Sequence, residues 1–198
     1  MRIISGFFKG RKILEPKDEK TRPLKDLTKE SIFNILKHSN KFDINFNNSI
    51  ILDLFSGVGS FGIECISRGA KKVVFIENYK NTLLILKKNL SNLATVDNYE
   101  IIEKNIYTEN FNENLNDRFD LIFLDPPYKD KNLEDLLVEI NDIKILHKNG
   151  IIIFDDFFVE GPGNKKFPGS RLAVEQFLGD EFKNIQPTVG GTYCYIKK

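Results

Sequence analysis

The pattern of apolar and polar positions divides the chain into a short leading part and a longer series of strands and helices. In residues 1–14, apolar residues recur loosely between two glycines, which predicts a short β-hairpin. Residues 15–25 are polar, contain two prolines and predict a loop. A helix capped by Asp26 or Thr28 should follow, because apolar residues then recur at helical spacing. Its expected apolar face consists of Leu27, Ile32, Ile35 and Leu36.

After the polar, turn-rich residues 37–48, short apolar runs alternate with helix-like stretches. Continuous apolar strands separated by helices are typical of a parallel sheet that is covered on both faces. The predicted strands are residues 50–55, 73–77, 99–102, 120–125 and 150–154. The predicted helices are residues 60–68, which Gly69 ends as a C-cap, 79–90 and 133–140.

The last part of the chain has a different pattern. A helix is expected around residues 172–178, followed by strands at 182–188 and 192–197 that a Gly-Gly turn joins. This arrangement predicts an antiparallel hairpin at the sheet edge. The fold class is therefore α/β, with a Rossmann-like, mostly parallel seven-stranded sheet and an N-terminal hairpin and helix extension.

Charge changes the picture of the leading part. The whole chain is nearly neutral, with 29 Lys and Arg against 28 Asp and Glu. Residues 1–41, however, carry eleven basic and five acidic side chains, a net charge of +6, and residues 42–198 carry a net −5. The sequence thus predicts a basic extension, residues 1–41, on a Rossmann-like domain, residues 42–198, and a polyanion as partner of the extension.

Composition narrows the class of protein. A hydrophobic content of 41% and 17 Phe exclude global disorder. No apolar run exceeds four residues, so we expect no membrane span, no signal-peptide core and a cytoplasmic location. Cys65 and Cys194 are 129 positions apart and are expected to be reduced thiols.

A glycine-rich turn follows the first predicted strand. Gly57, Gly59 and Gly62 have the G-x-G-x-x-G spacing of a nucleotide-binding turn, and Glu77 ends the second strand, where a carboxylate can accept hydrogen bonds from a ribose. Asp53 lies in the strand end and would repel a pyrophosphate, but it can bind an ammonium group or a sugar hydroxyl. This favours S-adenosylmethionine over a dinucleotide. The alternative is a glycine turn that serves only close helix packing.

A second motif, Asp125-Pro126-Pro127-Tyr128, follows the fourth strand at the sheet edge where an open α/β sheet binds its ligands. The Asp125 carboxylate and the Pro126 carbonyl are neighbouring acceptors that suit an exocyclic amine, and Tyr128 offers a flat face to a base. The motif is typical of amine methylation, but adenine N6, cytosine N4 and guanine N2 all remain possible acceptors. A Pro-Pro turn with a surface tyrosine is the structural alternative.

The pattern D-L-F-x-G-x-G-x-x-G with a strand-ending glutamate resembles the class I methyltransferases. The resemblance implies that the cofactor is S-adenosylmethionine. It places one group of residues at the methionine part of the cofactor: Asp53, Phe55, Gly57 and Gly59. It places a second group at the ribose and the adenine: Glu77, Asn78, Asn105 and Ile106.

The opening of the chain is similar to the RsmD family, which are bacterial 16S rRNA guanine-N2 methyltransferases. The shared pattern is R-I-I-x-G-x-x-K-G-R-K, then T-R-P, a helix ending F-N-x-L, S-R-G-A and L-D-P-P-Y, and it extends to about Phe154. The resemblance implies a guanine-N2 methyltransferase of 16S rRNA that acts on an assembling small subunit, and we expect the protein to be a monomer. It also implies residues that contact rRNA or shape the target-base pocket: Arg2, Lys9, Arg11, Lys12 and Arg22.

The tail departs from that family. Asp155-Asp156-Phe157-Phe158 and the residues after it look more like small-molecule O-methyltransferases, some of which bind a divalent metal with acids after the fourth and fifth strands. A solvated turn is the favoured interpretation of Asp155 and Asp156, and we assign no metal. The alternatives are a metal-dependent O-methyltransferase, another D-P-P-Y-type base methyltransferase, and a non-catalytic RNA-binding protein.

Overall fold

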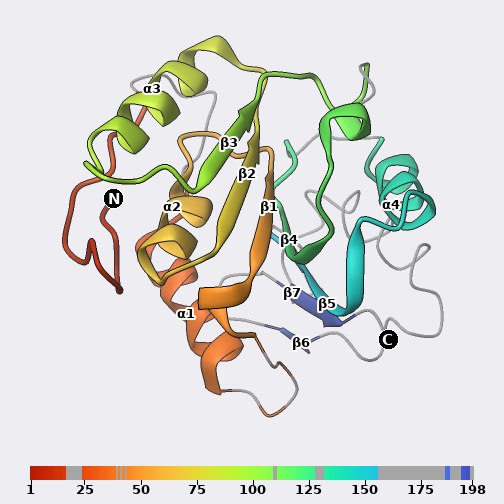
Figure 1. Ribbon diagram of the computed structural model, residues 1–198, viewed down its shortest axis with the longest axis horizontal. Helices are drawn as coiled ribbons and strands as arrows, with labels where there is room; N and C mark the ends of the chain where they lie inside the picture. Colours follow the sequence, from red (N-terminus) through yellow and green to blue (C-terminus); the bar gives the residue numbers. More distant parts are fainter. Residues whose placement is uncertain are drawn as a thin grey trace, which may run out of the picture.

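The computed structural model describes residues 1–16, 24–38, 40, 42, 44–108, 111–127, 132–155, 186–187 and 193–196. Its centre is a sheet in the strand order β3-β2-β1-β4-β5-β7-β6, seen in Figure 1. The strands are β1 (Ile50–Leu54), β2 (Lys72–Ile76), β3 (Tyr99–Ile102), β4 (Phe119–Leu124), β5 (Leu146–Phe154), β6 (Gln186–Pro187) and β7 (Tyr193–Ile196). The first five strands are parallel, and β7 pairs antiparallel with both β5 and β6. The predicted seven-stranded sheet with its antiparallel hairpin is confirmed.

Helices cover both faces of this sheet. On one face lie α1 (Asp26–His38), α2 (Ser60–Ser67) and α3 (Lys80–Ser91), and on the other lie α4 (Leu133–Asp142) and the short helix η2 (Phe111–Asn114). The short helix η1 (Phe46–Asn48) precedes β1. Successive strand residues alternate between the two core clusters, because side chains point to opposite faces of a strand: Ile51 packs with the first group of helices and Leu52 with the second. In the described part of the chain, no helix is long and apolar enough to cross a membrane.

Helix α1 buries a different face from the one expected. Leu27 is 68% exposed, so its prediction as a core residue is wrong. The buried positions are i, i+3, i+4 and i+7 of one stripe, and the first of them is charged: Lys29, Ile32, Phe33 and Leu36. Phe33 packs on Phe61 of α2 with 5.2 Å between the ring centroids. This contact sets the rotation of the helix and leaves Leu27 on the outside.

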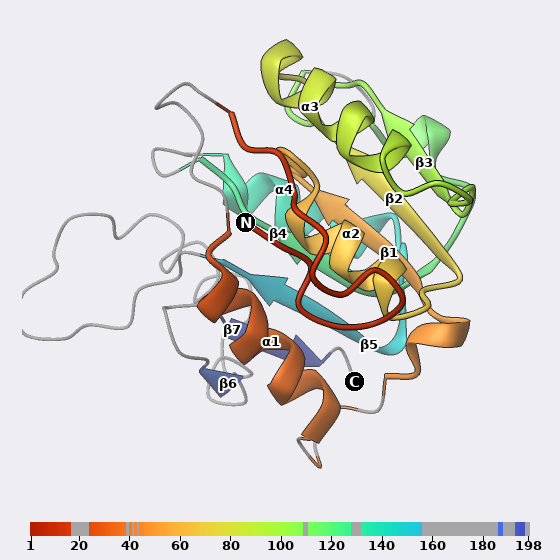
Figure 2. The ribbon, with the colours of Figure 1, turned by 90° about the vertical axis from the view of Figure 1, so that its left-hand side faces the viewer.

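The leading residues form the predicted hairpin, which Figure 2 shows lying across α2. Arg2 and Lys12 form an antiparallel bridge. Ile3 and Ile13 are each 1% exposed and belong to the same core cluster as the sheet face beneath them. The hairpin thus follows the period of two that strands require, with its apolar residues inward and its basic residues outward.

The turn of the hairpin is held against the C-terminal end of α2. The Phe7 N–H donates to the Ser67 carbonyl oxygen (2.7 Å), and the Phe8 N–H donates to Ser67 Oγ (3.0 Å). Gly6 has a φ of +83°, and a Cβ there would lie 1.7 Å from the Ser67 carbonyl oxygen. Only glycine permits both the left-handed backbone and this close approach.

We therefore expect Gly6→Ala to destabilise the fold by about 2–3 kcal/mol, because the new methyl group has to displace helix backbone. Gly10→Ala is the matched control: Gly10 also has a positive φ, of +86°, but nothing lies within 4 Å of its added Cβ. The control should lose only about 1 kcal/mol, the cost of the left-handed backbone alone. Urea unfolding of the two variants measures the difference, and equal losses would contradict the close contact at Ser67.

Candidate active site

The site is built around the turn that joins β1 to α2. Phe55, Gly57 and Gly59 all have positive φ values, of 59°, 55° and 81°. Ser56 fixes this turn to both neighbouring strands, because its hydroxyl donates to the Asp53 carbonyl oxygen (2.5 Å) and its backbone N–H donates to the Ile76 carbonyl oxygen (3.0 Å). The turn begins at the carboxyl end of β1, the edge at which an open α/β sheet binds its ligands.

The amide groups of the turn bond to carboxylates of the protein itself. The Gly57 N–H donates to Glu77 Oε2 (2.6 Å), and the Gly62 N–H donates to Asp53 Oδ2 (2.9 Å). A pyrophosphate site needs such amides to point at the ligand instead. The turn therefore fits a cofactor without phosphate, as the sequence indicated.

Glu77 ties the turn to the end of β2. Besides the Gly57 N–H, its carboxylate accepts hydrogen bonds from the backbone N–H groups of Asn78 (2.9 Å) and Tyr79 (2.7 Å). An ionised carboxylate offers about four acceptor positions, so three backbone donors leave room for a ribose hydroxyl. The same contacts hold the side chain in one orientation before any ligand arrives.

Asp53 is the most deeply buried acid of the site, with 1% of its surface exposed. Burial raises the pKa of its carboxyl to about 7, although the hydrogen bond from Gly62 opposes the rise. A carboxylate that water solvates poorly gains strongly from a nearby cation. Asp53 is thus suited to the positively charged methionine part of S-adenosylmethionine.

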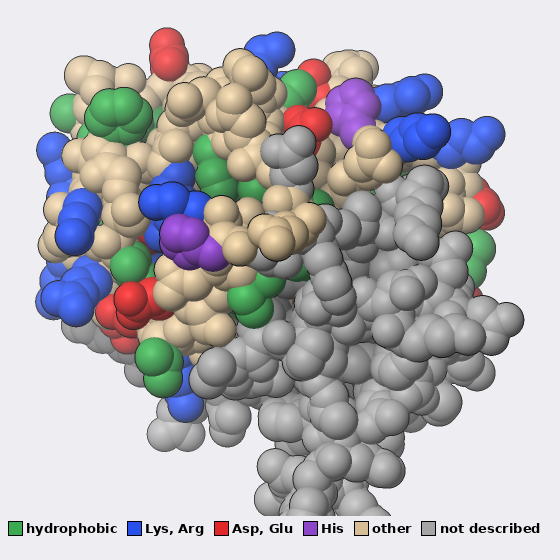
Figure 3. Space-filling view, turned by 90° about the horizontal axis from the view of Figure 1, so that it is seen from below, with side chains coloured by type: hydrophobic (Ala, Val, Ile, Leu, Met, Phe, Trp, Pro, Cys, Tyr) green, Lys and Arg blue, Asp and Glu red, His purple; other side chains and the backbone are tan. Residues whose placement is uncertain are grey.

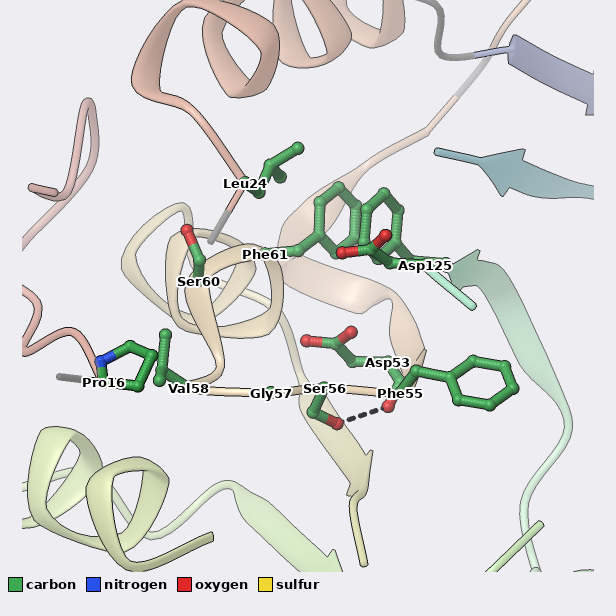
Figure 4. A pocket seen from close by; sticks show the side chains of 11 residues that line it. Pro16, Leu24, Asp53, Phe55, Ser56, Gly57, Val58, Ser60, Phe61 and Asp125 are labelled. Atoms are coloured by element: carbon green, nitrogen blue, oxygen red, sulfur yellow. Dashed lines mark hydrogen bonds between the residues drawn. The ribbon is translucent and has the colours of Figure 1, made fainter. Parts of the chain in front are cut away.

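Two hollows open beside the turn, and Phe55 lines both. The first, drawn in Figure 4, has about 380 Å³ of empty space, and the carboxylates of Asp53 and Asp125 point into it. Its walls are completed by Pro16, Leu24, Ser56, Gly57, Val58, Ser60, Phe61 and Phe123. The second has about 480 Å³ and is lined by Phe55, Ile76, Glu77, Asn78, Lys104, Asn105, Ile106, Tyr107 and Pro127.

The second hollow gathers all four residues predicted at the ribose and adenine: Glu77, Asn78, Asn105 and Ile106. Of the residues predicted at the methionine end, Asp53, Phe55 and Gly57 line the first hollow. Gly59 is not among the lining residues of either hollow. A Cβ on it would lie 2.4 Å from Leu86 Cδ1, so Gly59 permits the turn to pack on α3.

The predicted acceptor motif begins where β4 ends. Asp125 is half-buried, Pro126 is buried, and Pro127 is exposed at the edge of the second hollow. Asp125 lines the first hollow together with Asp53. Tyr128 and Arg22 lie outside the described residues.

Several lining residues had no sequence motif to mark them. Phe61 and Phe123 stack with 4.0 Å between their ring centroids and form one wall of the first hollow. Pro16 and Leu24 reach that hollow from the leading segment. Their role depends on the path of the chain through space, which periodicity does not reveal.

The four predicted RNA contacts that are described, Arg2, Lys9, Arg11 and Lys12, are all exposed on the hairpin. Figure 3 shows Lys and Arg side chains at the left rim of the molecule, the side where the hairpin lies in Figure 1, and a second group at the upper right. Arg11 is held in place, because its Nη1 donates to the Asn92 carbonyl oxygen (3.1 Å) and its guanidinium lies 4.9 Å from the Phe8 ring centroid.

Asp155 follows β5 and is 7% exposed, so the predicted solvated turn is wrong at this residue. Its N–H donates to the Leu124 carbonyl oxygen (2.8 Å), which places it beside the last residue of β4, next to Asp125 in the chain. Asp156 lies outside the described residues. Within the described ranges, no group of three or more His, Cys, Asp or Glu side chains is arranged to hold a metal ion.

Comparison with known proteins gives consistent matches. The family model described as conserved hypothetical protein 95 matches residues 1–162. The ribosomal RNA small subunit methyltransferase D of Haemophilus influenzae is 38% identical over 129 residues, 65% of this chain and 64% of that protein. The protein of the same name from Buchnera aphidicola subsp. Acyrthosiphon pisum is 36% identical over 153 residues, 77% of this chain and 76% of that protein. The SAH-bound methyltransferase PaMTH1 of Podospora anserina shares the fold, with a TM-score of 0.60 and 20% identity over 75% of this chain and 71% of that one.

Proposed function

We propose that this chain, which belongs to the RsmD family of class I methyltransferases, methylates the exocyclic N2 amine of a guanine in 16S rRNA. S-adenosylmethionine is the methyl donor. The observation that carries the proposal is the position of Asp125. Its carboxylate shares a hollow with the buried Asp53, and the second hollow, on the other side of Phe55, has the residues to hold an adenosine.

The chemistry follows from this arrangement. When bound, S-adenosylmethionine supplies a methyl group that its sulfonium already activates. The amine of a base is a poor nucleophile, because its lone pair is delocalised into the ring. Asp125 and the Pro126 carbonyl can accept the two amine hydrogens, which turns the lone pair out of the ring plane and toward the methyl carbon. Positioning of this kind is worth up to about 7–11 kcal/mol.

The proton balance completes the step. The amine nitrogen forms a bond to the methyl carbon as the carbon–sulfur bond breaks, and the nitrogen then loses one proton. Asp125 polarises the amine throughout, and the proton leaves to water, because an ordinary carboxylate is a weak base near neutral pH.

The basic leading segment has a separate role in the proposal. Residues 1–41 act as an rRNA-binding extension of the catalytic domain that residues 42–198 form. Exposed Arg and Lys side chains on the hairpin hold the RNA backbone through salt-sensitive contacts. The acting species is a monomer in the cytoplasm, with an assembling small subunit as its substrate, and light scattering of the purified chain tests the monomer.

An acceptor assay tests the proposed substrate class. The purified chain is incubated with methyl-labelled S-adenosylmethionine and either unmodified 16S rRNA or a catechol with Mg²⁺, each with and without EDTA. We expect label in the rRNA that EDTA does not prevent, and none in the catechol. EDTA-sensitive label in the catechol alone would establish the O-methyltransferase, and failure of the cofactor to raise the melting temperature would favour a non-catalytic RNA-binding protein.

The raised pKa of Asp53 predicts a pH dependence of cofactor binding. Its folded pKa of about 7 lies above the ordinary 3.8, so the folded apo protein binds more protons than the unfolded chain between these values. The contribution of Asp53 to stability therefore declines as pH rises from about 4 to 7. Because a cation needs the carboxylate form, the affinity for S-adenosylmethionine should be about tenfold lower at pH 6 than at pH 8.

Calorimetric titration of the cofactor at both pH values measures this effect. Asp53→Asn is the matched control, because it keeps the shape of the side chain and removes its titration. The variant should bind more weakly at pH 8 and show no change between pH 6 and pH 8. The same pH dependence in wild type and variant would show that another group titrates.

A further inference from the structure

One aromatic side chain is displayed to solvent on the hairpin turn. Phe7 is 85% exposed, more than any other large hydrophobic residue in the described part of the chain. Its neighbour Phe8 instead packs against the core cluster, as Ile3 and Ile13 do. Leaving a phenylalanine side chain in water gives up about 1.5–3 kcal/mol of the stabilisation that its burial would supply.

The backbone that carries Phe7 is fixed. Its N–H donates to the Ser67 carbonyl oxygen, the next N–H donates to Ser67 Oγ, and the Ser67 hydroxyl donates to the Ser5 carbonyl oxygen (2.5 Å). Gly6 is packed against the same helix end. The backbone that carries the ring is therefore already ordered in the folded protein. Binding a ligand does not have to offset the loss of backbone conformational entropy at this turn.

The hairpin that carries this ring is basic. Lys9, two residues further on, is exposed, and the Arg11 guanidinium is held over the Phe8 ring. Residues 1–12 contain four Lys or Arg and no acid. An exposed flat ring on a basic hairpin matches the sites where proteins stack single-stranded nucleic acid, in which a base contacts the aromatic face and phosphates contact the cations.

We propose that Phe7 stacks on an unpaired base of the rRNA substrate, while Lys9 and Arg11 contact the flanking phosphates. This rests on the proposed function. Phe7 is held at Ser67, the last residue of α2, whereas the catalytic hollow is lined by Ser60, the first residue. The helix rises about 10 Å between them, so the stacked base is a second nucleotide and not the one that is methylated.

The test replaces Phe7 by Leu and by Trp and measures binding to unmodified 16S rRNA by filter retention. Phe7→Leu removes the stacking face and should weaken binding about tenfold, whereas Phe7→Trp should bind at least as well as wild type. In the methylation assay, Phe7→Leu should raise KM for the rRNA by a similar factor and leave kcat and cofactor affinity within twofold. Because Phe7 is exposed, neither variant should change the melting temperature.

Leu84→Ala on α3 is the control, because Leu84 is 68% exposed and lies outside the hairpin; it should bind rRNA as wild type does. A Phe7→Leu protein that binds rRNA like wild type, or a Phe7→Trp protein that binds rRNA as weakly as Phe7→Leu, would overturn the stacking role.

Measurements of rRNA binding and of methylation distinguish failure of the stacking role from failure of the proposed function. Wild-type protein that binds rRNA through Phe7 without methylating it refutes the proposed function alone, and methylation that is indifferent to Phe7 refutes the stacking role alone.

Discussion

Asp125→Asn is expected to lower kcat for rRNA methylation by about hundredfold or more. The substitution keeps the size of the side chain but replaces one acceptor oxygen by an NH₂ group, which faces the amine hydrogens with hydrogens of its own. Loss of one preorganised polar contact in the transition state typically costs about 10²–10³ in rate. Asp125 is half-buried at the end of β4 and shares the hollow with Asp53, so its loss should act on the reacting amine.

Single-turnover kinetics with saturating rRNA measures this loss, and calorimetry should show cofactor affinity within about threefold of wild type. Asp117→Asn is a suitable control, because Asp117 forms an ion pair with Lys72 away from both hollows. An Asp125→Asn enzyme with near-normal turnover would refute the role of Asp125 as an acceptor for the amine hydrogens. EDTA-sensitive turnover of the wild-type protein that Asp155→Asn abolishes would point to the metal-dependent alternative.

The second large effect concerns a buried charged network that joins the hairpin to α2. Lys29 and Glu64 are both 0% exposed. Lys29 Nζ donates to the Arg2 carbonyl oxygen (2.8 Å) and Ser60 Oγ (3.3 Å), and lies 4.0 Å from Glu64 Oε2. Glu64 in turn accepts from the backbone N–H groups of Ile4 (2.7 Å) and Ser5 (3.0 Å).

We expect Glu64→Gln to reduce the free energy of unfolding by about 3–5 kcal/mol, the usual cost of breaking a buried ion pair. Arg68 (2.9 Å) and Lys29 both lose the carboxylate as counter-charge, and, of the described acids, Lys29 keeps only the partly exposed Asp26 at 3.7 Å. Burial already lowers the pKa of Lys29, and Glu64 is the main charge that opposes the fall. The amide of Gln also cannot accept both backbone N–H groups as the carboxylate does. The hairpin should therefore loosen, and proteolysis within residues 1–16 should become faster than in wild type.

Urea unfolding gives the size of the loss. Glu103→Gln is the matched control, because Glu103 pairs with Lys87 and is 51% exposed, so it should cost less than about 1 kcal/mol. A Glu64→Gln protein whose stability lies within about 1 kcal/mol of wild type would show that the pair does not hold the hairpin in place.

The sheet could be predicted because its strands are continuous apolar runs. Strand β3 has the predicted limits, and β1, β2 and β4 differ from prediction by one residue at their ends. Strand β5 begins at Leu146, four residues before the predicted start, because the polar residues 147–149 sit in an irregular stretch. Asn149 has a φ of 63° there, and the register with β4 shifts between Phe119 and Leu121. Local hydropathy does not reveal a strand that continues through such an irregularity.

The candidate site was predictable where glycines and acids follow strand ends, and the structure groups those residues around two hollows. The role of Lys29 was not predictable, because lysine is almost always exposed and its burial depends on Glu64, 35 positions away. Leu27 was predicted to be buried because it is apolar, but it is exposed, since the packing of Phe33 on Phe61 decides which stripe of α1 faces inward. Contacts between distant segments, not local pattern, determine these features.

The chemical identity of the product tests the central claim most directly. Unmodified 16S rRNA is incubated with the purified chain and S-adenosylmethionine, digested to nucleosides and examined by mass spectrometry. We predict that N2-methylguanosine appears with wild-type protein and is lost with Asp125→Asn. Methylation of another base, or N2-methylguanosine that persists at the wild-type rate in Asp125→Asn, would contradict the account.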